Sequence, residues 1–214
     1  MPIPVDVPFD FDALHKQCAP FVARATMKSF IKHESSFSPF AIGINGGARL
    51  ERQPQSKKEA IATANFLIEK GYNADFGYGQ INSKNVQRLN LDLNDIFDPC
   101  KNLHIAATIF LDNYNLALKS YKNPNDATLA AISAYNTGNF SNGFKNGYVK
   151  KIAYTALRYQ KEELPIEPNV QLSSNPAKIV QAQNNSYRPT VPKLEVQDKQ
   201  FQHERRVSTE QSHL

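Results

Sequence analysis

The segment Ala23–Pro39, ARATMKSFIKHESSFSP, gives the strongest indication of the fold and of a functional residue. Its apolar residues recur at three- and four-residue steps, which predicts a helix whose buried face ends at Glu34. The helix must stop soon afterwards, because the residue before Pro39 disfavours the α-helical region. Burial and the negative end of the helix dipole would both favour the neutral acid, and burial is the stronger effect. The pattern therefore predicts a buried proton donor, with a surface glutamate at a frayed helix end as the alternative.

The composition limits the possible partners. The chain has 214 residues, is 41% hydrophobic and carries a formal net charge of +5, which suits an anionic partner. Nucleic acid is disfavoured, because neither zinc-finger cysteine spacing nor interleaved aromatic and basic residues occur. No run of 18 apolar residues is present, so no membrane span is predicted. An acidic polymer such as the bacterial wall, or a membrane surface, fits the charge better.

Periodicity and capping residues predict a mainly α-helical domain over residues 10–163. The expected helices run from Asp10 or Asp12 through Gln17, from Pro20 to Glu34, from Lys57 to Lys70, from Ser83 to Leu89, from Cys100 to about Tyr121, from Ala127 to Asn136 and from Tyr148 to Glu163. The stretch Phe40–Gln55 is expected to form a loop or a small hairpin, and Leu91–Pro99 a connector. Asp126 is the expected cap of the helix that follows it.

Residues 164–214 have a different composition. They contain scattered prolines, many Gln, Asn and Ser residues, and no sustained apolar period. Such a segment cannot bury enough apolar surface to offset the conformational entropy lost on ordering. We therefore expect a flexible, disordered C-terminal tail that is separate from the domain.

The cysteines and histidines give no sign of a metal site. Cys18 and Cys100 lie far apart without metal-ligand spacing, so they form either a disulfide or two buried free thiols. A zinc-hydrolase motif at His33-Glu34 would need a second histidine one turn later, where Phe37 stands. Catalysis by a Cys-His pair is disfavoured, because Cys100 begins a helix far from the candidate motifs. No metal or cofactor is predicted.

Three short stretches carry candidate chemistry: HESSF at residues 33–37, GYGQIN at 77–82 and AYNTG at 134–138. In the second stretch, glycines two apart permit unusual backbone conformations and close approach of a ligand. Gln80 offers a donor and an acceptor, as sugar hydroxyl and acetamido groups require. In the third, the Tyr135 hydroxyl can reach a neighbouring acid and Asn136 offers an amide. Taken singly, the second stretch could be any turn, and the third is more typical of a half-buried core tyrosine with a helix C-cap.

Together and in this order, the three stretches resemble the soluble lytic transglycosylases, whose catalytic domain is similar to goose-type lysozyme. The resemblance covers about Cys18 to Ala156 and is strongest to the transglycosylases of type IV secretion systems, the first component of the VirB set. It implies a lysozyme-like α+β domain with a small loop or hairpin lobe, and a disulfide between Cys18 and Cys100. Tyr78 and Gly79 stand where many relatives carry Leu and Met, so the floor of the sugar cleft is expected to differ.

The resemblance also implies a reaction on peptidoglycan. Glu34 would protonate the MurNAc-GlcNAc β-1,4 oxygen and then, as a base, take the proton of the muramic acid 6-hydroxyl, which closes a 1,6-anhydro ring. Tyr135 would orient the Glu34 carboxyl group. The resemblance assigns substrate binding to Ser35, Ser36, Gln80, Asn82, Tyr135 and Asn136.

The same residues are compatible with two other activities. A hydrolytic lysozyme of the goose type would use a second carboxylate, for which Asp75 is the candidate, since Asn82 replaces the aspartate that would help most. A non-catalytic peptidoglycan-binding protein would use the tail to dock secretion-system components. The resemblance implies the periplasm, although the first residues, MPIPVDVPFDFD, lack the basic and apolar regions of a secretory signal.

Overall fold

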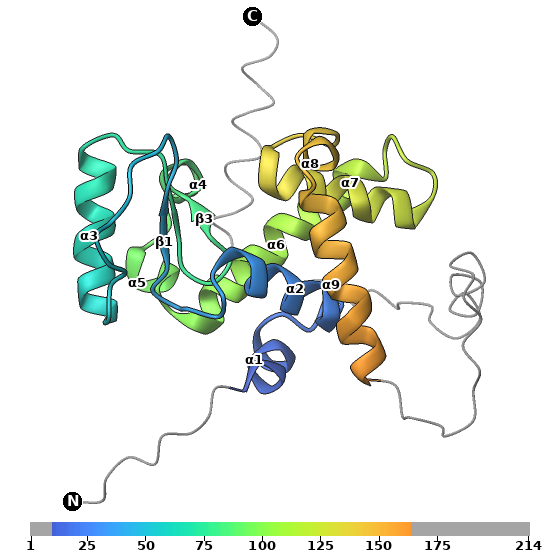
Figure 1. Cartoon of the computed structure of the whole chain (residues 1–214), viewed down its shortest axis with the longest axis horizontal. Coiled ribbons are helices and arrows are strands. Elements are labelled where there is room, and N and C mark those ends of the chain that lie inside the picture. Colours follow the sequence, from blue (N-terminus) through green and yellow to red (C-terminus); the bar gives the residue numbers. More distant parts are fainter. Residues whose placement is uncertain (1–9, 164–214) are drawn as a thin grey trace, which may run out of the picture. The chain divides into compact units, whose positions relative to one another are not determined.

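The protein is described by a computed structural model over residues 10–163, where helices surround a small antiparallel sheet (Figure 1). The helices are α1 Phe11–Cys18, α2 Arg24–Glu34, α3 Lys57–Glu69, α4 Ser83–Arg88, α5 Leu93–Ile96, α6 Pro99–Ala117, α7 Pro124–Thr137, α8 Asn142–Lys145 and α9 Tyr148–Glu163. The strands are β1 Ile42–Ile44, β2 Ala74–Phe76 and β3 Ile81–Asn82. The predicted mainly helical, lysozyme-like α+β fold is confirmed. The predicted tail lies outside the described residues.

Two predicted helix starts differ from those in the structure. Helix α2 begins at Arg24 and not at Pro20, because a turn from Ala19 to Val22 precedes it. Helix α7 begins at Pro124, since the Asn123 side chain accepts the N–H of residue 125. Two short helices, α5 and α8, lie in segments for which no helix was predicted, and four-residue helices leave little periodic signal.

The sheet has the order β1-β2-β3, with antiparallel neighbours. Strand β1 pairs with β2, which follows α3, so the predicted hairpin within Phe40–Gln55 is wrong and the loop alternative holds around a single strand. At the free edge, the Gln53 side chain accepts from the Ile42 N–H at 2.8 Å and donates to its C=O at 2.9 Å. This amide occupies the position that a second strand of a hairpin would take.

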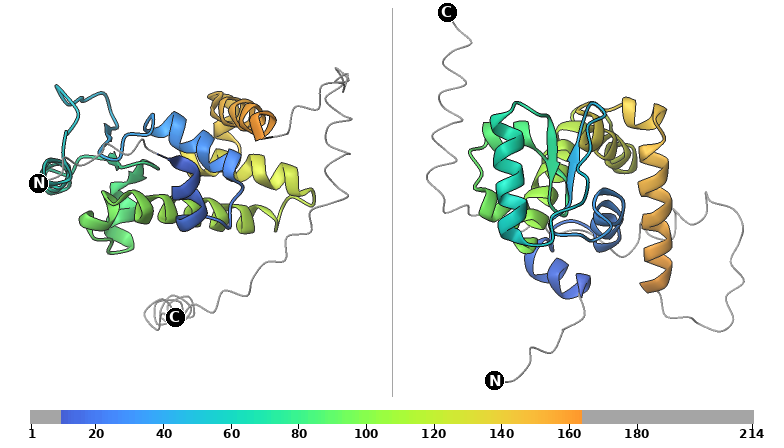
Figure 2. Two further views of the ribbon diagram at one scale, coloured as in Figure 1. Left: turned by 90° about the horizontal axis from the view of Figure 1, so that it is seen from below. Right: turned by 60° about the vertical axis from the view of Figure 1, so that its left-hand side comes forward.

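Helix α6 joins the two parts of the domain. In Figures 1 and 2 it runs from the sheet, α3, α4 and α5 at one end to α7, α8 and α9 at the other, and α2 packs against α9. Its buried face is formed by Leu103, Ala106, Ala107 and Phe110. The small side chains allow α7 and the loop after β2 to approach the helix closely.

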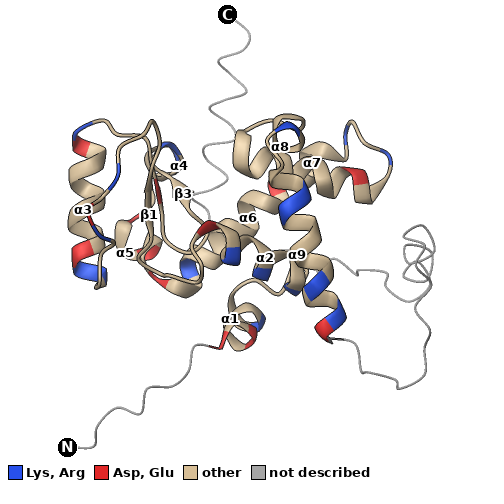
Figure 3. Ribbon diagram, viewed as in Figure 1, with Lys and Arg blue, Asp and Glu red and all other residues tan. Residues whose placement is uncertain are grey.

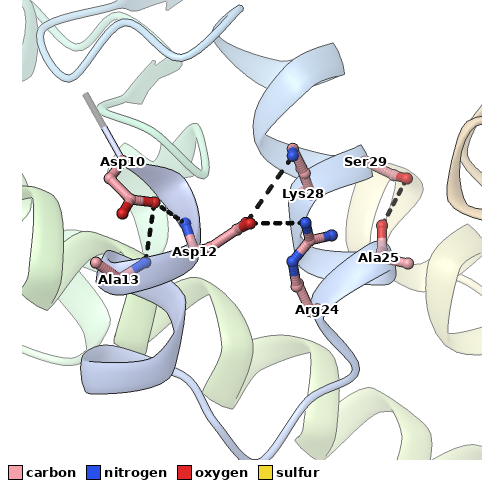
Figure 4. Close-up of polar contacts among 7 residues, drawn as sticks. All are labelled: Asp10, Asp12, Ala13, Arg24, Ala25, Lys28 and Ser29. Carbon is pink, nitrogen blue, oxygen red and sulfur yellow. Dashed lines mark hydrogen bonds and ion pairs between the residues drawn. The ribbon is translucent and has the colours of Figure 1, made fainter. Parts of the chain in front are cut away.

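Two contacts attach the N-terminal helices. The disulfide between Cys18 and Cys100, with Cα atoms 5.3 Å apart, joins the end of α1 to the start of α6 and confirms the pairing implied by the resemblance. Arg24 bonds Asp12 at 2.7 Å across α1 and α2, and Asp10 caps α1 (Figure 4). The Arg24 hydrogen bond lowers the pKa of Asp12. Because Asp12 is half exposed, this ion pair contributes little to stability.

The charged residues are spread unevenly over the described helices. Lys and Arg follow α9 along its length (Figure 3), while its inward face carries Val149 and Ile152. Among residues 10–163, no helix combines the length and apolar character that a membrane crossing requires.

Candidate active site

Glu34 is the last residue of α2 and lies next to a group of aromatic side chains. Phe30, one turn earlier on the same helix, is fully buried. Its ring centroid lies 4.6 Å from that of Tyr135 and 6.5 Å from that of Tyr148. The Glu34 carboxyl group is therefore held beside apolar rings, yet its side chain stays partly exposed and within reach of a ligand.

The surroundings of Glu34 change its acidity. Burial raises the pKa of Glu34 from its ordinary value of 4.5 to about 7. The hydrogen bond from Tyr148 opposes this rise, the negative charge of Asp75 adds to it, and the charge of Lys151 opposes it. Burial is the largest cause, as the sequence predicted. Near neutral pH the side chain is thus divided between an acid that can give a proton and a base that can take one.

Tyr148 is the site residue that the sequence analysis missed. As the first residue of α9, it donates its hydroxyl to Oε1 of Glu34, 114 residues away in the chain. The Asn146 side chain accepts the Tyr148 N–H at 3.0 Å and donates at 2.9 Å to the side chain of Asn136. Asn136, a predicted substrate-binding residue, therefore fixes the start of α9. The only signal in the sequence was a tyrosine on the inward face of a helix start.

Tyr135 has a different contact from the one expected. Its hydroxyl donates to the carbonyl oxygen of Gly79 at 2.7 Å, so the prediction that Tyr135 holds the Glu34 carboxyl is wrong and Tyr148 makes that bond. Burial raises the pKa of Tyr135, with the charges of Glu34 and Asp75 as further causes. The Tyr135 side chain thus connects the end of α7 to the glycine loop while remaining close to both carboxyl groups.

The loop Gly77–Gln80 is held by Asn102, a fully buried residue of α6. Its amide donates to the carbonyl oxygens of Phe76 at 3.1 Å and Ile96 at 2.7 Å, and its oxygen accepts the Gly79 N–H at 2.7 Å. Gly77 has a φ of 74°, as the sequence predicted for this loop. The close approach that the glycines permit is made by the protein itself, not by a ligand.

Gln80 follows this loop in a left-handed backbone conformation, with a φ of 49°. Its side-chain amide donates to the carbonyl oxygens of Ala41 at 3.1 Å and Gly77 at 3.0 Å. Both amide protons are therefore used within the protein. A Cβ atom on Gly43 would lie 2.8 Å from Oε1, so the glycine leaves space for this oxygen. Gln80 can present this oxygen as an acceptor to a ligand.

The two serines after Glu34 differ from each other. Ser35 is buried and donates its hydroxyl to the carbonyl oxygen of Ile31 at 3.2 Å. Ser36 is exposed, and both it and Phe37 have positive φ angles, 51° and 62°. Two non-glycine residues in this conformation end the helix sharply, and such strain is concentrated at functional sites. Of the two, Ser36 is the one exposed beside Glu34.

One face of the sheet is polar. Asp75 accepts from the Asn82 side chain at 2.6 Å and from the Asn45 side chain at 2.7 Å, one bond to each carboxylate oxygen. Asn82 also accepts the Lys84 N–H and so caps α4. The opposite face carries Ile42, Phe76 and Ile81, all buried. The charge of Asp75, on the polar face, raises the pKa of Glu34.

His33, the residue before Glu34, has a structural contact. The His33 ring shares a hydrogen bond of 2.7 Å with the Thr155 hydroxyl, and burial lowers the pKa of His33. Over residues 10–163, no group of three or more His, Cys, Asp or Glu side chains is arranged to hold a metal ion.

The fold and this site are those of a known family. Residues 13–157 match the family model described as the transglycosylase SLT domain, and the chain belongs to that family. It is 42% identical over 152 residues to the type IV secretion system protein virB1 of Brucella suis biovar 1 (strain 1330), covering 68% of this chain and 63% of the relative. It is 36% identical over 148 residues to protein virB1 of Agrobacterium tumefaciens (strain 15955), covering 69% and 61%.

The chain thus spans less than two thirds of the length of these relatives. No solved structure matches it significantly.

Proposed function

We propose that this protein is a lytic transglycosylase that cleaves the β-1,4 bond between MurNAc and GlcNAc in peptidoglycan and leaves a 1,6-anhydro-MurNAc end. Membership of the SLT family supports the reaction class. The observation that carries the proposal is the pKa of Glu34, raised by burial to about 7 in a side chain that a ligand can still reach. A single carboxyl group of this kind can serve in turn as acid and as base.

The reaction would proceed in two steps at Glu34. The protonated carboxyl group gives its proton to the glycosidic oxygen, the bond to C1 of MurNAc breaks, and the GlcNAc part leaves. The carboxylate then takes the proton of the 6-hydroxyl of the same MurNAc, whose oxygen attacks C1 and closes the anhydro ring. No water is consumed, and Glu34 ends protonated as it began. The Tyr148 bond to Oε1 would hold the carboxyl group in place, leaving the other oxygen to carry the proton.

The substrate-binding residues are part of the proposal. Gln80 would accept a hydrogen bond from the glycan, and Ser36 is exposed at the end of α2 beside the acid. Tyr135, Ser35 and Asn82 have their side-chain polar groups bonded within the protein, so we expect them to act mainly by shaping the site. Asn136 is exposed and only its side-chain oxygen is bonded, so its amide N–H groups would be the ones to contact the glycan.

The cellular role is proposed from the relatives. The names of two relatives at 42% and 36% identity place them in the virB1 group, and one name specifies a type IV secretion system. A protein of this kind would open the cell wall locally, in the periplasm, while a secretion system assembles. The segment 164–214 would then be the part that contacts secretion-system components.

Hydrolysis is a second candidate, favoured by one observation. Asp75 is a second carboxyl group close enough for its charge to raise the pKa of Glu34. In inverting glycosidases a carboxylate at a distance activates water, and in retaining ones a nearer carboxylate attacks the sugar. Both oxygens of Asp75 accept bonds from asparagine side chains, which leaves less capacity to take a proton from water.

The products separate these possibilities. Purified sacculi are digested with the full chain, and the released muropeptides are analysed by mass spectrometry. Anhydro ends support the transglycosylase, reducing ends heavier by one water support hydrolysis, and no release supports a non-catalytic binding protein. The variant Glu34→Gln keeps the shape but removes the acid, so we expect activity to fall by about 10³-fold. Full activity in that variant would refute the assignment.

A further inference from the structure

A hollow of about 360 Å³ lies at the free edge of the sheet, outside the contacts of Glu34 described above. It is lined by residues of β1 and of the loop that follows: Ile42, Gly43, Ile44, Gly47, Ala48, Arg49, Leu50 and Gln53. A volume of this order is at the lower end of the range for small-molecule sites. The lining combines aliphatic side chains with one cation, Arg49.

Arg49 is exposed, and among residues 10–163 no carboxylate lies within ion-pair distance of its guanidinium group. The neighbouring Arg52 differs, because it bonds Glu59 at 2.6 Å. A guanidinium group suits planar, bidentate binding of a carboxylate. The Arg49 guanidinium group at the hollow thus favours a ligand that carries a carboxylate.

The edge of β1 offers a second kind of contact. The Asn45 N–H bonds Asn73 and the Ala41 C=O bonds Gly77, so the odd-numbered residues face β2 and the even-numbered ones face the free edge. The Ile42 N–H and C=O at that edge are already bonded to the Gln53 side chain. The Ile44 N–H points to the same edge and makes no hydrogen bond within the described chain. An edge N–H of this kind can bind an extended peptide.

The hollow adjoins the candidate active site through Gly43. This residue lines the hollow, pairs with Asp75 across the sheet, and lies against the side-chain oxygen of Gln80. Asp75 in turn acts on Glu34 by its charge. A glycan bonded to the Gln80 side-chain oxygen would therefore lie beside Gly43, at the border of the hollow.

We propose that the hollow binds the acidic peptide attached to MurNAc, with a peptide carboxylate on Arg49 and the peptide backbone on the Ile44 N–H. This inference rests on the proposed function, because it takes the glycan bound beside Glu34 to be peptidoglycan. It adds a substrate preference: glycan strands that bear peptides bind better than bare strands.

Binding to the full chain carrying Glu34→Gln tests this inference without turnover. The probes are a GlcNAc-MurNAc tetrasaccharide with its peptides and the same tetrasaccharide without them, titrated by calorimetry. We expect the peptide-bearing probe to bind about threefold to tenfold more tightly. Adding Arg49→Gln should abolish this difference and leave the affinity for the bare sugar unchanged, while Arg49→Lys should keep part of it.

The control is Lys119→Gln, which removes an exposed cation at the end of α6 and should leave the difference intact. Equal affinity for the two probes, an Arg49→Gln effect of the same size on both, or no binding of either would overturn the inference. Failure of the proposed function would instead be seen as the absence of products when the unaltered chain digests sacculi.

Discussion

The two carboxyl groups of the candidate site lie in opposite surroundings. Glu34, at the end of α2, sits beside the rings of Phe30, Tyr135 and Tyr148 and receives one hydrogen bond from a hydroxyl group. Asp75, on the polar face of the sheet, receives an amide hydrogen bond at each oxygen. The helical side is apolar and the sheet side is polar, although both present the same functional group.

This difference shows how one fold can place the same functional group in two unlike environments. Loss of water around Glu34 disfavours its charged form and raises its pKa to about 7. The charge on the sheet side strengthens that effect from across the site. Under the proposed function, the helical side would provide the acid, and the sheet side would provide a negative charge and hydrogen-bonding groups for the sugar. Four predictions test this division.

The largest effect is expected on the sheet side, for Gly77→Ala. The added Cβ would lie 2.2 Å from the side-chain nitrogen of Asn102 and 2.7 Å from the carbonyl oxygen of Ile96, at a φ of 74°. We expect a loss of about 3–5 kcal/mol in the free energy of unfolding, measured with denaturant. Gly71→Ala is the matched control, because its φ is 75° but no atom lies within 4 Å. It should cost about 1 kcal/mol, and equal losses would show that packing against Asn102 is unimportant.

The second prediction concerns the apolar surroundings of Glu34. Its folded-state pKa of about 7 lies above the ordinary 4.5, so the folded state binds more protons between these values and stability falls as the pH rises through this window. Glu34→Gln removes this dependence. The variant should gain about 2–3 kcal/mol relative to the parent on going from pH 4 to pH 8.5, measured by denaturation at each pH. Parallel stability curves for parent and variant would mean that Glu34 is well solvated.

The third prediction separates the two tyrosines. Tyr148→Phe removes a hydrogen bond that lowers the pKa of Glu34, so this pKa should rise and the alkaline limb of the pH-activity profile should move to higher pH. Loss of orientation should also lower kcat/KM by about tenfold. Tyr135→Phe breaks only the bond to Gly79 and should cost about 1 kcal/mol of stability without moving the profile. The reverse result would return the orienting role to Tyr135.

The smallest effect is expected for Asp75→Asn, which tests the coupling between the two sides. Removing a negative charge that raises the pKa of Glu34 should lower this pKa and shift the alkaline limb to lower pH, by less than about one pH unit. Asp112→Asn, at an exposed carboxylate of α6, is the control and should leave the limb in place. A profile unchanged by Asp75→Asn would show that the two sides act independently.

The order of the helices and the place of Glu34 could be predicted from the sequence, because both depend on neighbours within a few residues. The three- and four-residue spacing before Glu34 and the proline after it suffice to end α2 at that residue. The Ser56 cap of α3 was predictable for the same reason. The α2 start was misplaced, since Pro20 suits a helix start and a turn equally well.

The partners of these residues could not be predicted in the same way. Asn102 looks like one polar residue on an apolar helix face, and only the packed structure shows it bonding both sides of the glycine loop. Strand β1 is too short to show a period, and its partner lies beyond α3. Of the two predicted alternatives, the loop is found and the hairpin is not, because the Gln53 side chain bonds the Ile42 N–H and C=O that a second local strand would have used.

The amino-acid sequence suffices to predict that a carboxylic acid ends an apolar helix face and that a glycine loop and a tyrosine-bearing helix end follow it in order. Which hydroxyl meets that acid depends on the packing of the helices, since Tyr148 and Glu34 are separated by 114 residues. Local backbone preferences act over one or two helical turns. The contact between α2 and α9, and with it the acidity of Glu34, depends on how the helices pack around α6.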